Sequence, residues 1–291
     1  MRRRIIMSGA RAAVPPAASR QAASLVVVGS VDGGRRWLDL EGAANARDVG
    51  GLPLDGGGAT RAGVLLRADN LQGLTGRDVE RLVHDLGLEV VVDLRTVVEV
   101  ELEGPGPLVA DGRVDIRHRS LYPEHGQRTD VDVDAVLPWA QDDGPDHDAH
   151  ESPAVRAYLG YLRDRPDSVV AALRDVARAR GAALVHCAAG KDRTGTVCAL
   201  ALATAGVQRA AIVADYVATA ERIEAIMARL QASPTYGPEL AGHSADSHAP
   251  HAETMERLLA ILDERHGGAA GWLAAHGFGD DDVRALRRRL T

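Results

Sequence analysis

The sequence predicts an α/β fold in which a mainly parallel central sheet is flanked by helices. Residues 88–94 are almost continuously apolar and rich in valine, a pattern typical of a strand buried on both faces of a parallel sheet. Residues 182–186 predict a second short buried strand. Helical patterns over 153–162 and 167–180 lie between these strands in the chain, and strands that are separated by helices indicate parallel pairing.

Shorter elements are predicted in the N-terminal half. Three segments have strand character, at 24–29, 37–40 and 63–67. Thr75 is a suitable N-cap for a helix, because apolar side chains follow it at helical spacing, namely Val79, Leu82, Val83 and Leu86. Apolar and polar residues alternate over 114–121, which indicates one more strand.

The C-terminal part is predicted to be helical. One helix is expected from about Asp192 to Ala205, and another from Gln208 to about Leu230. Two or three amphipathic helices are expected from His251 onward. The glycines at 267 and 268 and those at 277 and 279 divide them, because glycine commonly ends a helix.

The chain is expected to form a single domain over residues 24–291, a length that one hydrophobic core can support. Residues 1–23 are expected to be a disordered tail. They lack the apolar core of a signal peptide, because glycine, arginine and proline interrupt their apolar residues. Two segments are expected to be loop or lid insertions: 122–152, which is acidic and broken by glycine and proline, and 232–250, which is rich in serine, proline and histidine.

The composition excludes several classes of protein. A formal net charge of −7 argues against non-specific nucleic-acid binding, which needs a broad basic face. No apolar run approaches the roughly 20 residues of a membrane span, so stable membrane insertion is not expected. Two cysteines cannot form a disulfide framework and fit a reducing compartment, which favours the cytoplasm, although non-classical secretion is compatible with the sequence. The oligomeric state is not indicated.

No metal or other cofactor is expected. The aspartates at 130, 132 and 134 have a calcium-like spacing, but the turn glycine and the terminal glutamate of a calcium loop are missing. His243, His248 and His251 lie in a proline- and serine-containing segment without the helical spacing of ligands on one face. We interpret both groups as solvated loop residues.

One loop is predicted to contain the reactive residues. It lies between the strand at 182–186 and the helix that begins near Asp192. Its residues Cys187, Ala188, Ala189, Gly190 and Lys191 are mostly small, so the backbone can approach a ligand closely. Successive N–H groups and the positive end of the following helix can then surround one anion. The sequence therefore predicts an oxyanion cradle for a phosphate group, formed by residues 188–193.

Cys187 lies at the mouth of this cradle and is the predicted nucleophile. A helix N-terminus and a neighbouring cation can lower a cysteine pKa from about 8.5 to roughly 3.5–7.5, which yields a reactive thiolate. Arg193 is placed to bind two phosphate oxygens with its planar fork. The Thr194 hydroxyl is expected to hydrogen-bond the sulfur, and His186 to brace the loop from behind. Cys198 is expected to lie in the core.

A leaving alkoxide or phenoxide needs a proton, so a general acid must lie near the scissile oxygen. Asp192, inside the loop, is favoured. Asp93 is the alternative, because it ends a buried strand at the edge where parallel-sheet sites form, although a salt bridge to Arg95 or Arg47 would explain it equally well. An aspartate from 122–152 is a third candidate.

Lys191 is the only lysine in a chain that has 33 arginines. A compact ammonium that stands alone among guanidinium groups is a candidate for a role that arginine cannot fill. Lys191 is therefore predicted to place a second cation beside the substrate phosphate; the alternative is an exposed side chain on the rim of the loop.

The loop resembles the active-site loop of the protein-tyrosine phosphatase superfamily, and specifically of the bacterial PtpB-type tyrosine and dual-specificity phosphatases, which read His-Cys-x-x-Gly-Lys-Asp-Arg-Thr-Gly. Residues 45–51, Asn-Ala-Arg-Asp-Val-Gly-Gly, are similar to the N-terminal element Asn-Phe-Arg-Asp-Leu-Gly-Gly of that family, with Ala46 in place of the usual aromatic residue. Further similar landmarks follow in the expected order: 66–71, 93–95 with Glu99, 215–216 and 255–268.

The resemblance implies a cysteine-dependent phosphatase-like fold and hydrolysis of phosphate monoesters through a phosphocysteine on Cys187. It implies a phosphorylated protein or a phosphoinositide as the partner, and supporting roles for Asn45, Arg47 and Arg95. The target can be phosphotyrosine, phosphoserine or phosphothreonine, or a phosphoinositide, and a phosphoinositide-specific lipid phosphatase is an alternative. A sulfurtransferase and a phosphate-binding pseudophosphatase are further alternatives. The spacing of Arg193 and Thr194 argues against the first, and the intact pair of Cys187 and Arg193 argues against the second.

Overall fold

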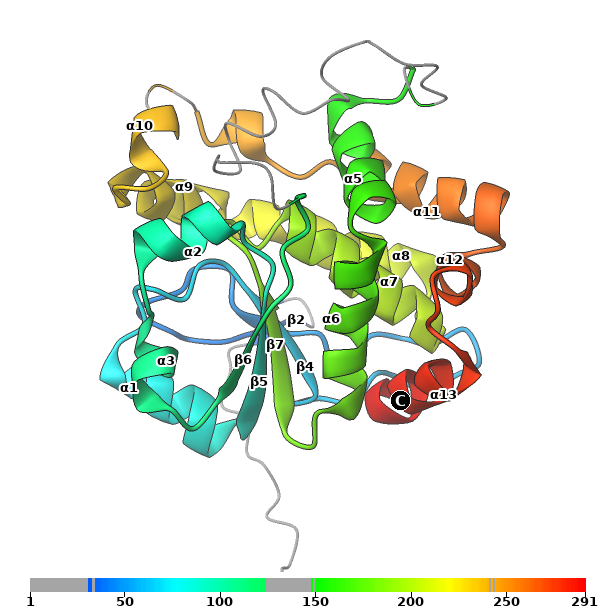
Figure 1. The fold of residues 1–291 in the computed structure, drawn as a ribbon, viewed down its shortest axis with the longest axis horizontal. Coiled ribbons are helices and arrows are strands. Elements are labelled where there is room, and N and C mark those ends of the chain that lie inside the picture. The colour runs from blue at the N-terminus through cyan, green and yellow to red at the C-terminus, as the bar shows by residue number, and fades with distance from the viewer. Residues whose placement is uncertain (1–30, 33–34, 124–147, 149, 241, 243) are drawn as a thin grey trace, which may run out of the picture.

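The computed structural model describes residues 31–32, 35–123, 148, 150–240, 242 and 244–291 (Figure 1). The predicted strand at 24–29, the N-terminal tail, most of segment 122–152 with its aspartates at 130–134, and His243 lie outside the described residues. None of the described helices is long and apolar enough to cross a membrane.

One sheet forms the centre of the described part of the chain. Its seven strands run in the order β1 (Val31–Asp32), β2 (Arg35–Trp37), β3 (Arg47–Asp48), β4 (Leu65–Ala68), β7 (Ala182–His186), β5 (Leu88–Asp93) and β6 (Asp115–His118). The strands β4, β7, β5 and β6 pair in parallel, whereas β1 to β4 pair antiparallel. The predicted parallel sheet is confirmed, and an antiparallel ribbon of short strands extends one edge of it.

The parallel register determines where the site forms. His186, the last residue of β7, is level with Ala68 at the end of β4 and with Asp93 at the end of β5. The carboxyl ends of three neighbouring strands therefore meet at one edge of the sheet. This is the edge at which ligands bind in open parallel sheets.

Alternate residues of the central strands pack on opposite faces, as the two-residue period of a strand requires. Val90, Val92 and Val185 belong to the larger core cluster, whereas Val91 and Leu184 belong to a second cluster on the other face. Both faces are covered, which explains the continuous apolar run of β5.

The smaller layer contains α1 (Gly76–Glu80), a π-helical turn (Arg81–Asp85), α2 (Val97–Glu103) and α3 (Pro107–Asp111) (Figure 1). The predicted cap is confirmed, because the Thr75 side chain accepts from Asp78 N in a capping box. The helix α2 was not predicted. Its sequence alternates valine and glutamate, which has the period of a strand, but a capping box between Thr96 and Glu99 starts a helix there.

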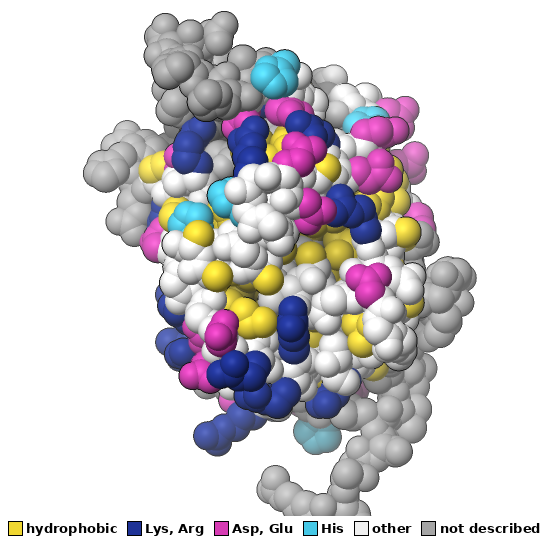
Figure 2. Space-filling view, turned by 90° about the vertical axis from the view of Figure 1, so that its right-hand side faces the viewer, with side chains coloured by type: hydrophobic (Ala, Val, Ile, Leu, Met, Phe, Trp, Pro, Cys, Tyr) yellow, Lys and Arg dark blue, Asp and Glu magenta, His cyan; other side chains and the backbone are white. Residues whose placement is uncertain are grey.

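The larger layer lies on the other side of the sheet and contains helices from the C-terminal half. They are α5 (Pro153–Asp164), α6 (Pro166–Arg178), α7 (Asp192–Ala205), α8 (Arg209–Val217), α11 (Ala252–His266), α12 (Ala269–Ala275) and α13 (Asp280–Leu290) (Figure 1). The boundaries predicted for the helix after the loop and for the division at glycines 267–268 are confirmed. Basic side chains gather on the lower part of the face that Figure 2 shows. The last turn of α13 is basic, with Arg287, Arg288 and Arg289.

The prediction of one continuous helix over 208–230 is wrong. After α8 the chain forms a 3-10 turn (Ala218–Arg222) and then α9 (Ile223–Ala232). The Arg47 guanidinium donates to the main-chain oxygen of Asp215 and to the hydroxyl of buried Thr219. A carbonyl that is bound by a side chain competes with the helical pattern, and this tertiary contact could not be seen in the helix sequence itself.

Two strand boundaries also differ from the prediction. The predicted strand at 37–40 overlaps the observed strand only at Trp37, the last residue of β2, and Leu38 N still donates to Ala46 O in the same antiparallel register. The strand predicted at 114–121 is reduced to β6, an edge strand whose side chains are mostly exposed.

Segment 232–250 is more ordered than a surface loop. It contains α10 (Gly237–Leu240) and a 3-10 turn (Asp246–His248). Tyr236 and Leu240 are buried in a small cluster with Ala188 of the loop that follows β7. The segment therefore packs against that loop, as expected for an insertion near the site.

Candidate functional site

Residues 187–191 form a loop between the C-terminal end of β7 and the first turn of α7. The segments that follow both neighbouring strands hold it. Asn70 N, after β4, donates to Ala188 O, and Leu94 N, after β5, donates to His186 O. Cys187 itself is 1% exposed. The strand–loop–helix arrangement predicted from the sequence is therefore formed at the carboxyl edge of the sheet.

The carbonyl groups of the loop are held on its scaffold side. Asn45 Nδ2 donates to Ala189 O at 3.0 Å and to Gly190 O at 3.1 Å, and Arg67 Nη2 donates to Gly190 O at 2.7 Å. In a planar trans peptide the N–H points away from the carbonyl of the preceding residue. The N–H groups of Ala189, Gly190 and Lys191 are therefore directed away from this scaffold, as an anion cradle requires.

Gly190 is required at its position for two reasons. Its φ angle is +68°, in the left-handed region that favours glycine, and a Cβ atom there would lie 2.4 Å from Ala68 O. Any larger residue would push the loop off the end of β4.

A buried charge network lies behind the loop. Asp215 binds Arg47 Nε at 2.8 Å and Arg67 Nη1 at 2.5 Å, and Arg47 also binds Asn45 Oδ1. Burial and the neighbouring Arg67 lower the pKa of Arg47 to about 10, while the two arginines outweigh burial and hold the pKa of Asp215 at about 2. Asn45 and Arg47 therefore support the loop and do not line it.

Arg193 is completely buried, and its orientation is fixed by Glu99. Its Nη1 donates to Glu99 Oε2 at 2.8 Å and its Nη2 to Glu99 Oε1 at 3.0 Å, while its Cζ lies 5.4 Å from the centre of the Tyr122 ring. Glu99 in turn accepts from Thr96 N at 2.6 Å and from the Tyr236 hydroxyl at 3.0 Å. Burial would raise the pKa of Glu99, but Arg193 lowers it, so the carboxylate keeps its charge.

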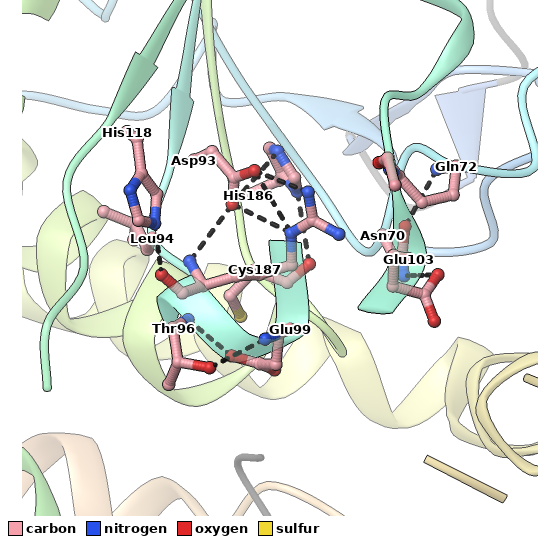
Figure 3. A network of polar contacts seen from close by, with 12 residues as sticks. Asn70, Gln72, Asp93, Leu94, Thr96, Glu99, Glu103, His118, His186 and Cys187 are labelled. Carbon is pink, nitrogen blue, oxygen red and sulfur yellow. Dashed lines mark hydrogen bonds and ion pairs between the residues drawn. The ribbon is translucent and has the colours of Figure 1, made fainter. Parts of the chain in front are cut away.

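Asp192 and Asp93, the two candidate acids, lie in different surroundings. The Asp192 side chain is 30% exposed, accepts a hydrogen bond from the Tyr158 hydroxyl, and has Oδ2 3.5 Å from Lys191 Nζ. Asp93 is buried and is bound by Arg95 through Nε at 2.9 Å and Nη2 at 2.6 Å (Figure 3). Burial would raise the pKa of Asp93, but His186 when protonated, and then Arg95, outweigh it and lower the pKa below its ordinary value.

Lys191 does not stand on an exposed rim. Its side chain is 15% exposed, and Nζ donates to His248 O at 2.8 Å. The ammonium thus connects the loop to segment 232–250. The predicted hydrogen bond from Thr194 to the sulfur is not formed: the Thr194 hydroxyl is buried and has no hydrogen-bond partner among the residues that the structure describes.

His186, which is predicted to brace the loop, lies beside Cys187 and Asp93. Its Nδ1 lies 3.2 Å from Cys187 O and its Nε2 3.6 Å from Asp93 Oδ1 (Figure 3). Burial lowers its pKa from 6.5 to about 4, so the ring is neutral at neutral pH. Cys198 is buried, and burial raises its pKa to about 11, which agrees with a core position.

His186 predicts a pH dependence of stability. Its pKa is lower in the folded chain than in the unfolded chain, so the unfolded chain binds more protons between about pH 6.5 and 4, and stability is lost as the pH falls through this window. We expect the free energy of unfolding in urea to fall by about 2 kcal/mol from roughly pH 7.5 to pH 5. His186→Gln should flatten this slope; an unchanged slope in that variant would assign the dependence to other groups.

Several functional residues could not be assigned from the sequence alone. Glu99 fixes Arg193, Arg67 binds the loop, and Tyr158 binds Asp192. Two signals were available: Glu99 completes the capping-box pattern Thr-x-x-Glu, and Arg67 interrupts an otherwise apolar strand. Neither signal identifies the partner, which lies far away in the chain.

Known proteins are similar to this chain in sequence. The model of a family described as "Tyrosine phosphatase family" matches residues 38–291. A "Tyrosine-protein phosphatase" of Nostoc commune is 31% identical over 242 residues, which cover 80% of this chain and 76% of that protein. The "Triple specificity protein phosphatase PtpB" of Mycobacterium tuberculosis is 31% identical over 280 residues, which cover 86% and 97%.

A third relative, a "Putative tyrosine-protein phosphatase" of Cupriavidus necator, is 32% identical over 203 residues, or 65% of each chain. The family model includes every element that builds the loop and its supports, from Asn45 to Arg193. The match over most of the chain, together with the strand–loop–helix geometry at Cys187, establishes the relationship. The chain belongs to the tyrosine phosphatase family and is a protein-tyrosine phosphatase.

Proposed function

We propose that this phosphatase acts through a covalent phosphocysteine on Cys187, with Arg193 as the phosphate-binding residue and Asp192 as the general acid. The observation that supports this most is the loop whose carbonyl groups are bound by Asn45 and Arg67, between a buried cysteine and an arginine oriented by Glu99. The loop N–H groups and the start of α7 then face a phosphate with positive potential.

In the first step the Cys187 thiolate attacks phosphorus, a P–S bond forms, and the P–O bond to the leaving group breaks while Asp192 donates its proton to the departing oxygen. In the second step water attacks phosphorus, Asp192 accepts a proton from that water, and the P–S bond breaks. Inorganic phosphate and the thiolate are released. Arg193 and the loop N–H groups stabilise the equatorial oxygens in both transition states.

Asp192 is better suited than Asp93 to donate this proton. Asp93 is bound by Arg95 on both oxygens, and its lowered pKa leaves it without a proton near neutral pH. Asp192 lies at the first turn of α7, beside Arg193, and part of its side chain is open to solvent. The third candidate, an aspartate of 122–152, lies outside the described residues apart from Asp148, which binds Arg265.

The general acid can be identified by comparing how much a substitution slows substrates with poor and with good leaving groups. For Asp192→Asn we expect kcat/KM, which reports the step that expels the leaving group, to fall by about 10²–10³-fold on a phosphoserine peptide, a poor leaving group, and by less than about tenfold on an activated aryl phosphate. Asp93→Asn is the matched control and should show no dependence on the leaving group, because its loss frees Arg95 and disturbs the loop generally. Selectivity that appears in Asp93→Asn, with equal losses for Asp192→Asn, would reverse the assignment.

The substrate class is proposed as phosphotyrosine in proteins, with activity on phosphoserine, phosphothreonine and phosphoinositides as a wider range. One relative carries the words "triple specificity" in its name, which supports testing a wide range here. Lys191 gives little support to activity on phosphoinositides, because its ammonium already binds His248 O and lies near Asp192.

Phosphate release from a matched panel of phosphotyrosine and phosphoserine peptides and phosphoinositides tests this range. Turnover of lipids without turnover of peptides would contradict the proposal and favour a lipid phosphatase. We further propose that the protein acts in the cytoplasm, because two buried cysteines cannot form a disulfide framework and fit a reducing compartment.

A further inference from the structure

We propose that Tyr158 is a positioning residue for the general acid, and that a hydrogen-bonded relay from Tyr216 through Tyr158 holds Asp192 so that Oδ2 faces the leaving group. The inference rests on the proposed function and names residues that this function does not require. Tyr158 comes from α5, Tyr216 from α8 and Asp192 from α7. Three helices therefore converge on one carboxylate.

The direction of the relay follows from proton counting. The Tyr158 hydroxyl donates to Asp192 Oδ1, and its oxygen lies 2.7 Å from the Tyr216 hydroxyl. A phenol has one proton, so Tyr158 cannot donate to both neighbours. Tyr216 therefore donates to Tyr158, and Tyr158 donates to Asp192. Hydrogen bonds in such a chain polarise and strengthen one another.

The surroundings of both phenols keep their hydroxyl groups protonated, so that each can donate a hydrogen bond. Tyr158 is 1% exposed and Tyr216 is 2% exposed. Burial, and then the negative charge of Asp192, raise the pKa of Tyr158 well above its usual value, and the same two causes raise the pKa of Tyr216. Neither phenol loses its proton at any pH at which the enzyme would be assayed. The relay thus orients Asp192 without exchanging a proton itself.

Packing prevents the two hydroxyl groups from swinging away. The rings of Tyr158 and Tyr216 meet edge to face with their centres 6.3 Å apart, and Tyr161 stacks on Tyr158 at 6.0 Å. Gly195, one turn after Asp192 in α7, leaves room for this arrangement, because a Cβ atom there would lie 3.0 Å from the Tyr216 ring. Glycine inside a helix weakens it, so the space for Tyr216 is a reason to keep glycine there.

The relay leaves one carboxylate oxygen available. Oδ1 is bound by the buried phenol, whereas the side chain as a whole is 30% exposed. Oδ2, which Tyr158 does not bind, lies 3.5 Å from Lys191 Nζ and is the oxygen that can hold the proton for the leaving group. A general acid must be held in such a geometry to transfer its proton efficiently.

The chain supplies a matched control for the test. Tyr161 lies on the same helix as Tyr158 and is also buried, but its hydroxyl lies 3.0 Å from the Tyr122 hydroxyl. For Tyr158→Phe we expect kcat/KM on a phosphoserine peptide to fall about tenfold and kcat/KM on an activated aryl phosphate to change less than about twofold, a part of the full general-acid effect. Tyr161→Phe should affect both substrates equally.

A double-variant comparison separates positioning from general damage. In an Asp192→Asn background, Tyr158→Phe should cause no further leaving-group-dependent loss, because both changes remove the same proton donation. Tyr216→Phe should show the same selectivity in weaker form. The variant with Tyr158→Phe and Tyr216→Phe together, which leaves no phenol unpaired, should match Tyr158→Phe if the fold is kept.

The outcomes distinguish a failure of the relay from a failure of Asp192 as the proposed general acid. Equal losses on both substrates for Tyr158→Phe, or a selective loss that persists in the Asp192→Asn background, would overturn the relay. If Asp192→Asn alone keeps its leaving-group selectivity in that case, the proposed general acid stands and only the relay fails. If Asp192→Asn shows no selectivity, the relay falls together with the acid assignment.

Discussion

Cys187→Ser is expected to reduce kcat by at least about four orders of magnitude on every phosphate monoester, the scale on which loss of a nucleophile acts in hydrolases. A serine hydroxyl stays protonated near neutral pH and is then a weak nucleophile. His186 has its two nitrogens near Cys187 O and Asp93. The bound loop carbonyls and Arg193 do not depend on the sulfur, so binding of a phosphotyrosine peptide should be retained.

The measurement pairs turnover with binding. Titration calorimetry should give the Cys187→Ser variant a peptide Kd within about threefold of the value for a non-hydrolysable ligand on the unchanged enzyme. Mass spectrometry after rapid acid quenching should find a phosphoryl group on the peptide that contains Cys187. Cys198→Ser is the matched control: it removes a buried sulfur eleven positions along the chain and should keep most of the activity in the folded fraction. Appreciable turnover by Cys187→Ser would point to another nucleophile.

Arg193→Lys is expected to have the second largest effect, a fall in kcat of about 10²–10³-fold, comparable to the loss of one preorganised transition-state donor. An ammonium is a point charge and cannot bind Glu99 through two parallel hydrogen bonds while it also faces phosphate. Glu99 is completely buried, so one of its oxygens would lose a charged partner. We therefore also expect a loss of about 1–3 kcal/mol in the free energy of unfolding.

Arg67→Lys separates these two effects. Arg67 is as buried as Arg193 and pairs with a buried carboxylate, Asp215, but it binds the loop carbonyl and not the cradle side. A similar loss of stability in urea is expected, with a decrease in kcat of less than about tenfold, because the cradle keeps its charged donor. If both variants lose activity equally, Arg193 acts through loop stability and not through phosphate binding.

The sequence by itself determined those features that depend on neighbouring residues. The strands β5 and β7, the cap at Thr75 and the helical nature of the C-terminal part follow from local periodicity, capping and glycine, which act within a few residues. The loop at 187–193 could also be predicted, because its small residues, its cysteine and its arginine are contiguous between a strand and a helix. Such features can be recognised in the sequence because the interactions that produce them act between residues that are close together in the chain.

Only the tertiary structure decided which groups hold that loop and how its acids are paired. Asn45 reaches Gly190 over 145 positions, Glu99 reaches Arg193 over 94, and Arg47 reaches Asp215 over 168. The pairing of Asp93 with Arg95 was one of several alternatives until the structure placed them. The physical reason is that buried polar groups must find partners wherever the packed strands and helices bring them, and that proximity is fixed by the fold rather than by distance along the chain.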